Sequence, residues 1–156
     1  MRAALLVSAC LAAGCANFAA IGPGDSAQAV EKRVGAPTGV WKNPDGSELW
    51  EYAQGPYGRQ TYMVTLGSDH AVRAVHQVLS EEYFSRVRSG MSRDEVRQLL
   101  GKPGEIAVFP VRGEEVWSWR YQQENPMLFH VLFDRGSGTV KGTQRLDEIL
   151  YQDGDD

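Results

Sequence analysis

The chain has 156 residues, of which 42% are hydrophobic, and a formal net charge of −4 at pH 7. This length suits one ordinary domain or two small ones. No basic stripe of the kind that binds nucleic acid stands out, so no nucleic-acid partner is expected. After the N-terminal region, no apolar run is long enough to span a bilayer as a helix.

The first fifteen residues, "MRAALLVSACLAAGC", have the outline of a secretory signal: one positive charge at Arg2, a short apolar stretch and small residues before a cysteine. The run "LAAGC" resembles the lipobox of bacterial lipoproteins, although Ala12 stands where leucine is usual. The resemblance implies cleavage after residue 14 and acylation of Cys15. Cys10 is a second candidate, and an ordinary signal peptide is the alternative.

Acylation of Cys15 also agrees with the cysteine count. Cleavage before Cys15 leaves no other cysteine, and acylation removes a thiol that would otherwise be unpaired in an oxidising compartment. Two or more acyl chains anchor a protein stably in a membrane. Ala16 follows the cysteine in place of an aspartate, and the sorting rule that comes with the resemblance then implies the outer membrane.

Residues 92–100 predict a well-delimited helix. Ser92 and Glu95 have the spacing of a capping box. Gly101 suits the residue that ends a helix, and Pro103 prevents its continuation. The apolar stripe of this helix consists of Val96, Leu99 and Leu100.

The same punctuation occurs 66 positions earlier, where Ser26, Gly35 and Pro37 match Ser92, Gly101 and Pro103. With one inserted residue, the strand positions match as well: Glu48 with Glu115, Trp50 with Trp117, Val64 with Val131 and Leu66 with Phe133. Residues that commonly begin and end helices would explain the match of the two helices, but not the match of the strand positions. The sequence therefore predicts a tandem duplication, with units at 15–79 and 80–150 and an acidic tail at 151–156.

Each unit is predicted to be α+β, with two helices followed by three antiparallel strands and the helices packed on one sheet face. Alternating aromatic and apolar residues, such as Trp117, Trp119 and Tyr121, indicate the buried side of the strands. The strands are expected near residues 48–54, 57–67 and 71–79, and near 114–122, 127–135 and 139–148.

No set of residues points to catalysis. His70, His76 and His130 are scattered, without a cysteine or carboxylate at the spacing of a metal site. There is no Gly-x-Ser-x-Gly elbow and no phosphate-binding loop. The sequence therefore predicts a protein with no catalytic residues, no metal and no cofactor.

The run "FSRVRSGMSRDEVRQLLGKP", followed by "VWSWRY", resembles the outer-membrane lipoprotein family BamE, also called SmpA/OmlA. The second unit matches this pattern over residues 80–148, whereas the first has Asp25 in place of the family's methionine. The typical member has one unit, not two. The resemblance implies an accessory role at the β-barrel assembly machinery, with contacts to partner proteins and to anionic phospholipid at the periplasmic face of the outer membrane.

The segments 38–47 and 104–113 differ most between the two copies and are predicted to be long connections that carry recognition. Trp41, Phe109 and Pro110 are the candidate partner-binding residues, because an aromatic side chain on an exposed loop is a typical anchor. The alternative is that Trp41 and Phe109 fold back over the edge of the core.

The leading hypothesis is a lipid-anchored, non-catalytic protein-binding scaffold of the outer membrane, acting in β-barrel assembly or envelope integrity. The alternative is an inhibitor-like module that clasps a target protein, because paired helix-plus-sheet units are also the architecture of the β-lactamase inhibitory proteins. A third hypothesis, a periplasmic hydrolase with an unrecognised site, is disfavoured.

Overall fold

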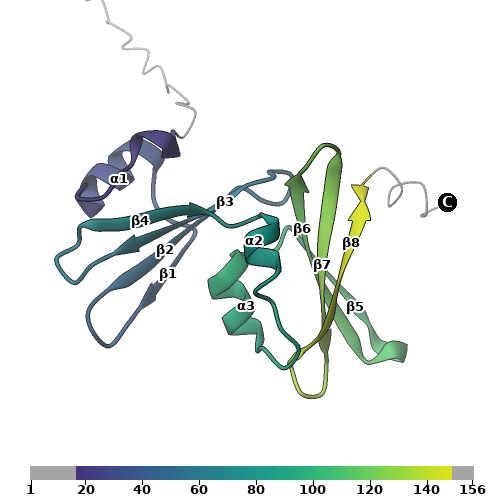
Figure 1. Cartoon of the computed structure of the whole chain (residues 1–156). Coiled ribbons are helices and arrows are strands. Elements are labelled where there is room, and N and C mark those ends of the chain that lie inside the picture. Colours follow the sequence, from purple (N-terminus) through teal and green to yellow (C-terminus); the bar gives the residue numbers. More distant parts are fainter. Residues whose placement is uncertain (1–16, 149–156) are drawn as a thin grey trace, which may run out of the picture.

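The computed structural model describes residues 17–148, which form two four-stranded antiparallel sheets (Figure 1). The first sheet has the order β1 (Gly39–Lys42), β2 (Glu48–Ala53), β3 (Thr61–Leu66), β4 (Val72–Gln77). The second has the order β5 (Glu105–Phe109), β6 (Glu114–Gln122), β7 (Pro126–Asp134), β8 (Val140–Asp147). The signal region with Cys10 and Cys15, and the acidic tail 151–156, lie outside the described residues.

The helices are short. They are the 3-10 helices η1 (Phe18–Ala20) and η2 (Pro110–Arg112) and the α-helices α1 (Ala27–Val34), α2 (Glu81–Phe84) and α3 (Arg93–Leu100). Within residues 17–148, none is long and apolar enough to cross a membrane.

The predicted fold class is wrong, because the described chain is mostly β and each sheet has a fourth strand. The segments 38–47 and 104–113, which were predicted to be connections, contain these strands, β1 and β5. Their β-branched and aromatic residues suit an extended conformation, and each strand forms a hairpin with the strand that follows it. The predicted first helix of the first unit is only the three-residue η1, and the first sheet is covered on both faces.

The two principal helices begin and end as the sequence predicts. The side chain of Ser26 accepts a hydrogen bond from the amide of Ala29, and Ser92 forms a complete capping box with Glu95. Gly35 and Gly101 end the helices at φ 87° and 79°, a region of backbone space that favours glycine. The six strands predicted from alternation are also present, close to their expected positions.

The hydrogen bonds at the helix ends correspond between the two halves. The carbonyl of Gly35 accepts from the Tyr52 hydroxyl at 3.2 Å, and that of Gly101 accepts from Trp119 Nε1 at 3.2 Å. The strand register also shifts at matching places, between Thr65 and Leu66 in the first sheet and between Leu132 and Phe133 in the second. Both halves therefore share one hydrogen-bonding plan.

The elements form successive layers. Figure 1 shows α1 over one face of the first sheet, and α2 and α3 between the two sheets. The close approach of α3 to the first sheet is visible at Gly101, where an added Cβ would lie 2.6 Å from Thr61 Cγ2. One core lies between α1 and the first sheet and includes Val30, Trp50 and Val64. The other lies between α3 and the second sheet and includes Val96, Leu100, Trp119 and Phe129.

Candidate functional site

One sheet face is left uncovered by helices: the face of the second sheet that is turned away from α3, called here the open face. Strand alternation puts Trp117 and Trp119 in the core and therefore turns Val116 and Ser118 to the open face. The strand register adds their cross-strand neighbours on the same face, which are Glu105, Ala107 and Phe109 on β5, His130 and Leu132 on β7, and Gln144 and Leu146 on β8.

The open face is hollowed by about 410 Å³. Its floor and walls combine apolar side chains (Ala107, Phe109, Val116, Leu132, Leu146) with polar ones (Arg112, Glu114, Ser118, His130, Gln144). Phe109 and Leu146 are each 40% exposed, although both are large apolar residues. A hollow that combines exposed apolar side chains with convergent polar groups is a candidate binding surface.

A polar row crosses the middle of the open face in the order Glu105, Ser118, His130, Gln144, one residue from each strand. Ser118 and His130 are buried, and the serine Oγ lies 2.7 Å from His130 Nδ1. Burial lowers the pKa of His130, while Glu105 has a smaller, opposing effect. The imidazole is therefore held towards its neutral form, in which one nitrogen can accept a hydrogen bond.

The serine–histidine hydrogen bond does not have the layout of a hydrolytic triad. In such triads the carboxylate lies on the far side of the imidazole and orients it. Here Glu105 is the cross-strand neighbour of Ser118, so the carboxylate lies on the serine side of the row. The pair instead satisfies two polar groups at the floor of the hollow. Among residues 17–148, no group of histidine, cysteine and acidic side chains is arranged to hold a metal ion.

The candidate residues predicted from sequence lie in different surroundings. Phe109 lines the hollow, and the Arg112 guanidinium lies 5.5 Å from the centre of its ring. Pro110 follows as the first residue of η2. Trp41 lies on β1 in the first sheet, with the Arg97 guanidinium of α3 at 5.9 Å from its ring. The structure thus does not bring Trp41 and Phe109 together.

Ser118 and His130 were not identified as site residues from the sequence. Ser118 lies between two tryptophans, and His130 lies between Phe129 and Val131. Because the apolar neighbours face the core, the alternation predicts that Ser118 and His130 point to the opposite face of the sheet. Their pairing depends on the β6–β7 register, which joins Ser118 to His130 across the sheet.

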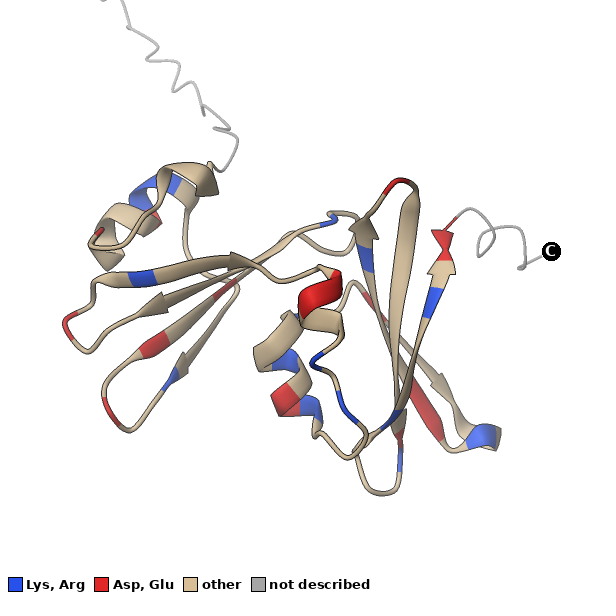
Figure 2. Ribbon diagram, in the orientation of Figure 1, with Lys and Arg blue, Asp and Glu red and all other residues tan. Residues whose placement is uncertain are grey.

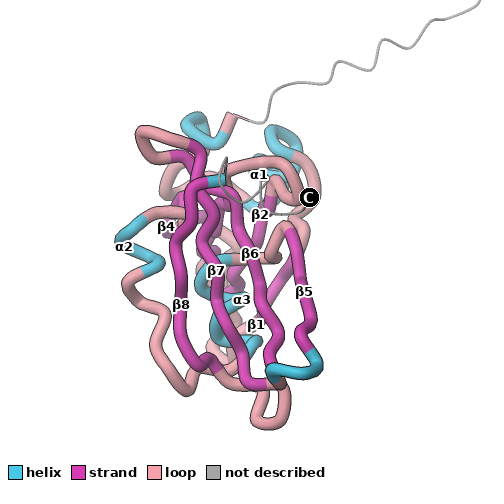
Figure 3. Tube along the Cα trace, turned by 90° about the vertical axis from the view of Figure 1, so that its right-hand side faces the viewer, coloured by secondary structure: helices cyan, strands magenta, loops and turns pink. Residues whose placement is uncertain are grey.

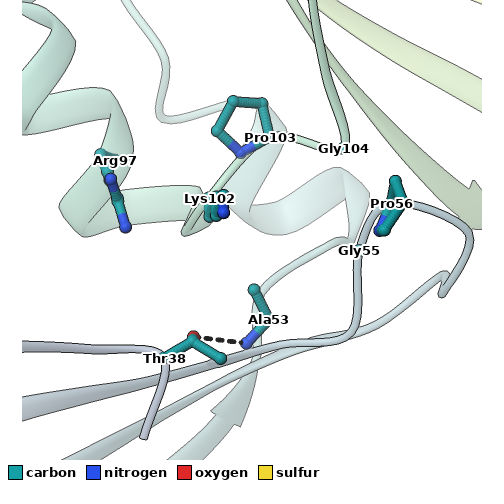
Figure 4. A pocket seen from close by; sticks show the side chains of 8 residues that line it. All are labelled: Thr38, Ala53, Gly55, Pro56, Arg97, Lys102, Pro103 and Gly104. Atoms are coloured by element: carbon teal, nitrogen blue, oxygen red, sulfur yellow. Dashed lines mark hydrogen bonds between the residues drawn. The ribbon is translucent and has the colours of Figure 1, made fainter.

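A second hollow, of about 580 Å³, lies where the two sheets meet (Figure 4). Thr38 and Ala53 are on the side of the first sheet, with Arg97, Lys102 and Pro103 opposite. Thr38 Oγ1 accepts from the Ala53 amide at 3.0 Å and donates to Glu51 Oε1 at 2.7 Å. These hydrogen bonds are internal to the first sheet and brace it next to α3.

Two ionic contacts join the halves around this hollow. Glu51 is fully buried, and its Oε2 lies 3.5 Å from Arg97 Nε on α3. Glu148 accepts from Arg59 at 2.6 Å and from Arg120 at 2.8 Å. Burial raises the pKa of Glu148, but the hydrogen bonds from the two arginines outweigh it and leave the pKa below its ordinary value. The hollow between the sheets therefore belongs to an interface that holds the halves together.

No protein-family model matches the chain, and no curated protein matches it significantly. Some solved structures are similar. One, described provisionally as the osmotically inducible lipoprotein OsmE, is 26% identical, with a TM-score of 0.39 over 45% of this chain and 75% of that chain. Another, described provisionally as a β-lactamase inhibitor protein from Streptococcus mutans, is 13% identical, with a TM-score of 0.33 over 78% of this chain and 82% of that chain.

A third similar structure, an extracellular protein with an SCP domain from Bacillus anthracis, is 14% identical, with a TM-score of 0.31 over 83% of this chain and 45% of that chain. One of the three neighbours is thus a lipoprotein and another an inhibitor-like protein. At such low TM-scores the function has to be inferred from the residues of this chain.

Proposed function

We propose that this protein is a lipid-anchored, non-catalytic binding module that holds a partner protein on the open face of its second sheet. The finer proposal is that it is anchored at the periplasmic face of the outer membrane through an acylated Cys15 and acts in β-barrel assembly or envelope integrity. The lipobox-like run and the BamE-like motifs support this finer proposal. We also propose that the two halves arose by tandem duplication.

The observation that carries the proposal is a difference between equivalent faces. In the first sheet, the face that carries Trp41 and the buried Glu51, Thr61 and Met63 is covered by α3. The equivalent face of the second sheet is the open face, which is hollowed and carries exposed Phe109 and Leu146. A face that packs against protein in one copy is a natural docking surface in the other.

The test is site-specific photo-cross-linking in native membranes. A photoreactive residue replaces Gln144, which is exposed on the open face, or Thr143, which is exposed and pairs with core-facing Val131. We expect a discrete protein adduct from position 144 and none from position 143. Equal adducts from both positions would contradict docking on this face. Barrel-assembly subunits in the adduct would support the finer role, whereas a secreted enzyme would support an inhibitor.

The anchor is tested separately. Cys15→Ser should abolish palmitate labelling and move the protein out of the outer-membrane fraction, because the proposed acyl chains would have no attachment site. Cys10→Ser is the matched control and should change neither result. Labelling that persists in Cys15→Ser and is lost in Cys10→Ser would assign the anchor to Cys10 instead.

A further inference from the structure

Each sheet has two edge strands, and unpaired backbone groups on an edge can pair with another chain unless the edge is protected. Three of the four edges carry protective features. β1 ends in Lys42, β4 carries Arg73 and has a register shift against β3, and β8 carries Lys141 and Arg145. The remaining edge strand, β5, begins with Glu105 and then reads Ile-Ala-Val-Phe, without lysine, proline or glycine.

β5 is apolar and exposed on both of its faces. Ile106 is 54% exposed and Val108 is 47% exposed on the side of α3, and Phe109 is 40% exposed on the open face. Figure 3 shows β5 at the outer edge of the second sheet. After Glu105, the sheet therefore ends in an exposed apolar strand without lysine, and this strand borders the hollow of the open face.

The comparison with β1 shows that this edge differs from its counterpart. Val40 pairs with Trp50 as Ile106 pairs with Trp117, so these two positions are equivalent. At the next equivalent position, Lys42 pairs with Glu48, whereas Val108 pairs with Glu115. Lys42, which protects the β1 edge of the first sheet, therefore corresponds to the exposed Val108 on the β5 edge of the second sheet.

We infer that β5 binds an extended segment of a partner protein by strand addition, so that the segment becomes a fifth strand of the second sheet. This inference extends the proposed function and rests on it for the partner. Backbone hydrogen bonds would supply the affinity, and apolar side chains would pack beside Ile106, Val108 and Phe109.

The charges at the end of β5 specify the segment further. Arg112 lies beside Phe109, and the Arg135 amide donates to the Gly113 carbonyl at 2.9 Å, so two arginines flank the turn after β5. The charge of Arg135 helps to lower the pKa of Glu115, whereas Arg112 has no salt bridge within residues 17–148, and Figure 2 shows the basic η2 at this end of the strand. We therefore expect an apolar, β-branched segment with an acidic residue at the end near Arg112.

The experiment measures peptide binding to the full-length lipidated protein in detergent by fluorescence anisotropy. The probe is an acetylated, amidated peptide that begins with aspartate and continues with alternating valine and threonine, so that antiparallel pairing with β5 places the aspartate near Arg112. One control peptide begins with lysine instead, and another has the sequence of the probe with alternate backbone nitrogens methylated. We expect the aspartate peptide to bind, the lysine peptide to bind several-fold more weakly, and the methylated peptide not to bind. Equal binding of the methylated peptide would overturn strand addition without requiring any protein variant.

Val108→Lys tests the edge by introducing the residue that the first sheet has at this position. We expect it to weaken binding of the aspartate peptide about tenfold, because a charged side chain disrupts apolar cross-strand contacts. Val40→Lys, at an equally exposed site on the other edge, should leave binding unchanged. Equal affinities of the two variants would overturn the inference. Self-association that is lost only in Val108→Lys would instead assign the edge to a second copy.

Failure of this inference is distinguishable from failure of the proposed function. If position 144 still forms its specific adduct but no peptide binds, the edge inference fails and docking on the open face stands. If the peptide binds at β5 but position 144 gives no specific adduct, docking on the open face fails.

Discussion

The two sheets have the same strand order and the same helix-end hydrogen bonds, yet the same face has opposite surroundings in each. In the first sheet, Glu51 and Met63 on this face are buried at the contact with α3. In the second sheet, the equivalent Ser118 and His130 form the floor of a hollow on the open face. This face of the first sheet is thus buried against the second half of the molecule, whereas the equivalent face of the second sheet is exposed.

The difference shows how a repeated fold can divide its roles. A small sheet with one covered face has little core, and stacking a second unit against its other face adds buried apolar area. The first sheet gains this from α3, which closes its second face. The second sheet is last in the stack and has no following unit in the described chain. Within residues 17–148, no helix or sheet covers its open face.

The largest expected effect comes from the two helix-ending glycines. Gly35→Ala and Gly101→Ala should each add backbone strain of about 1–3 kcal/mol, because both glycines have positive φ. A Cβ at Gly35 would meet nothing within 4 Å, whereas a Cβ at Gly101 would lie 2.6 Å from Thr61. Gly101→Ala should therefore cost about 1–3 kcal/mol more. Equal losses of unfolding free energy in urea titrations would contradict tight packing of α3 on the first sheet.

A smaller contrast is expected at the equivalent positions Glu51 and Ser118. Glu51→Ala removes the carboxylate that accepts from Thr38 and faces Arg97, and should cost about 2 kcal/mol. Ser118→Ala removes one hydrogen bond, to His130, and should cost about 1 kcal/mol. Thermal and urea unfolding of both variants would measure the contrast. A larger loss in Ser118→Ala would mean that the open face contributes more to stability than the contact between the halves.

Local signals in the sequence were sufficient for part of the fold. The ends of α1 and α3 follow from Ser26, Ser92, Gly35 and Gly101, whose side chains or torsional freedom act within a single turn. Six strands followed from alternation, because one side of each strand lies against a core. The strands β1 and β5 were missed because they have only four and five residues and lie in segments that differ most between the two halves.

The candidate site was harder to predict because it depends on contacts between distant segments. Glu51 reads as a surface acid, and only the stacking of α3 makes it a buried partner of Arg97. The Ser118–His130 pair requires the β6–β7 register, which a shift of one residue would destroy. Phe109 was identified from the sequence as a candidate, but its neighbours in the hollow come from four strands and η2. Such convergence is a property of the sheet and not of any one segment.

The smallest expected effect is a dependence of stability on pH that originates at His130. Burial lowers the pKa of this side chain below its ordinary value of 6.5, so the unfolded state takes up a proton more readily than the folded state. The free energy of unfolding should therefore decrease as the pH falls below about 6.5 and increase as the pH rises.

The variant His130→Met isolates the contribution of this histidine. It introduces the residue that the first sheet has at this position, Met63, and should flatten the profile between about pH 7.5 and pH 5.5. The carboxylates with lowered pKa values, such as Glu115 and Glu148, titrate below this interval and do not obscure it. Urea titrations at several pH values would measure the slope for both proteins. An identical slope in His130→Met would mean that His130 binds protons equally in the folded and unfolded states, which is incompatible with its burial at the floor of the open face.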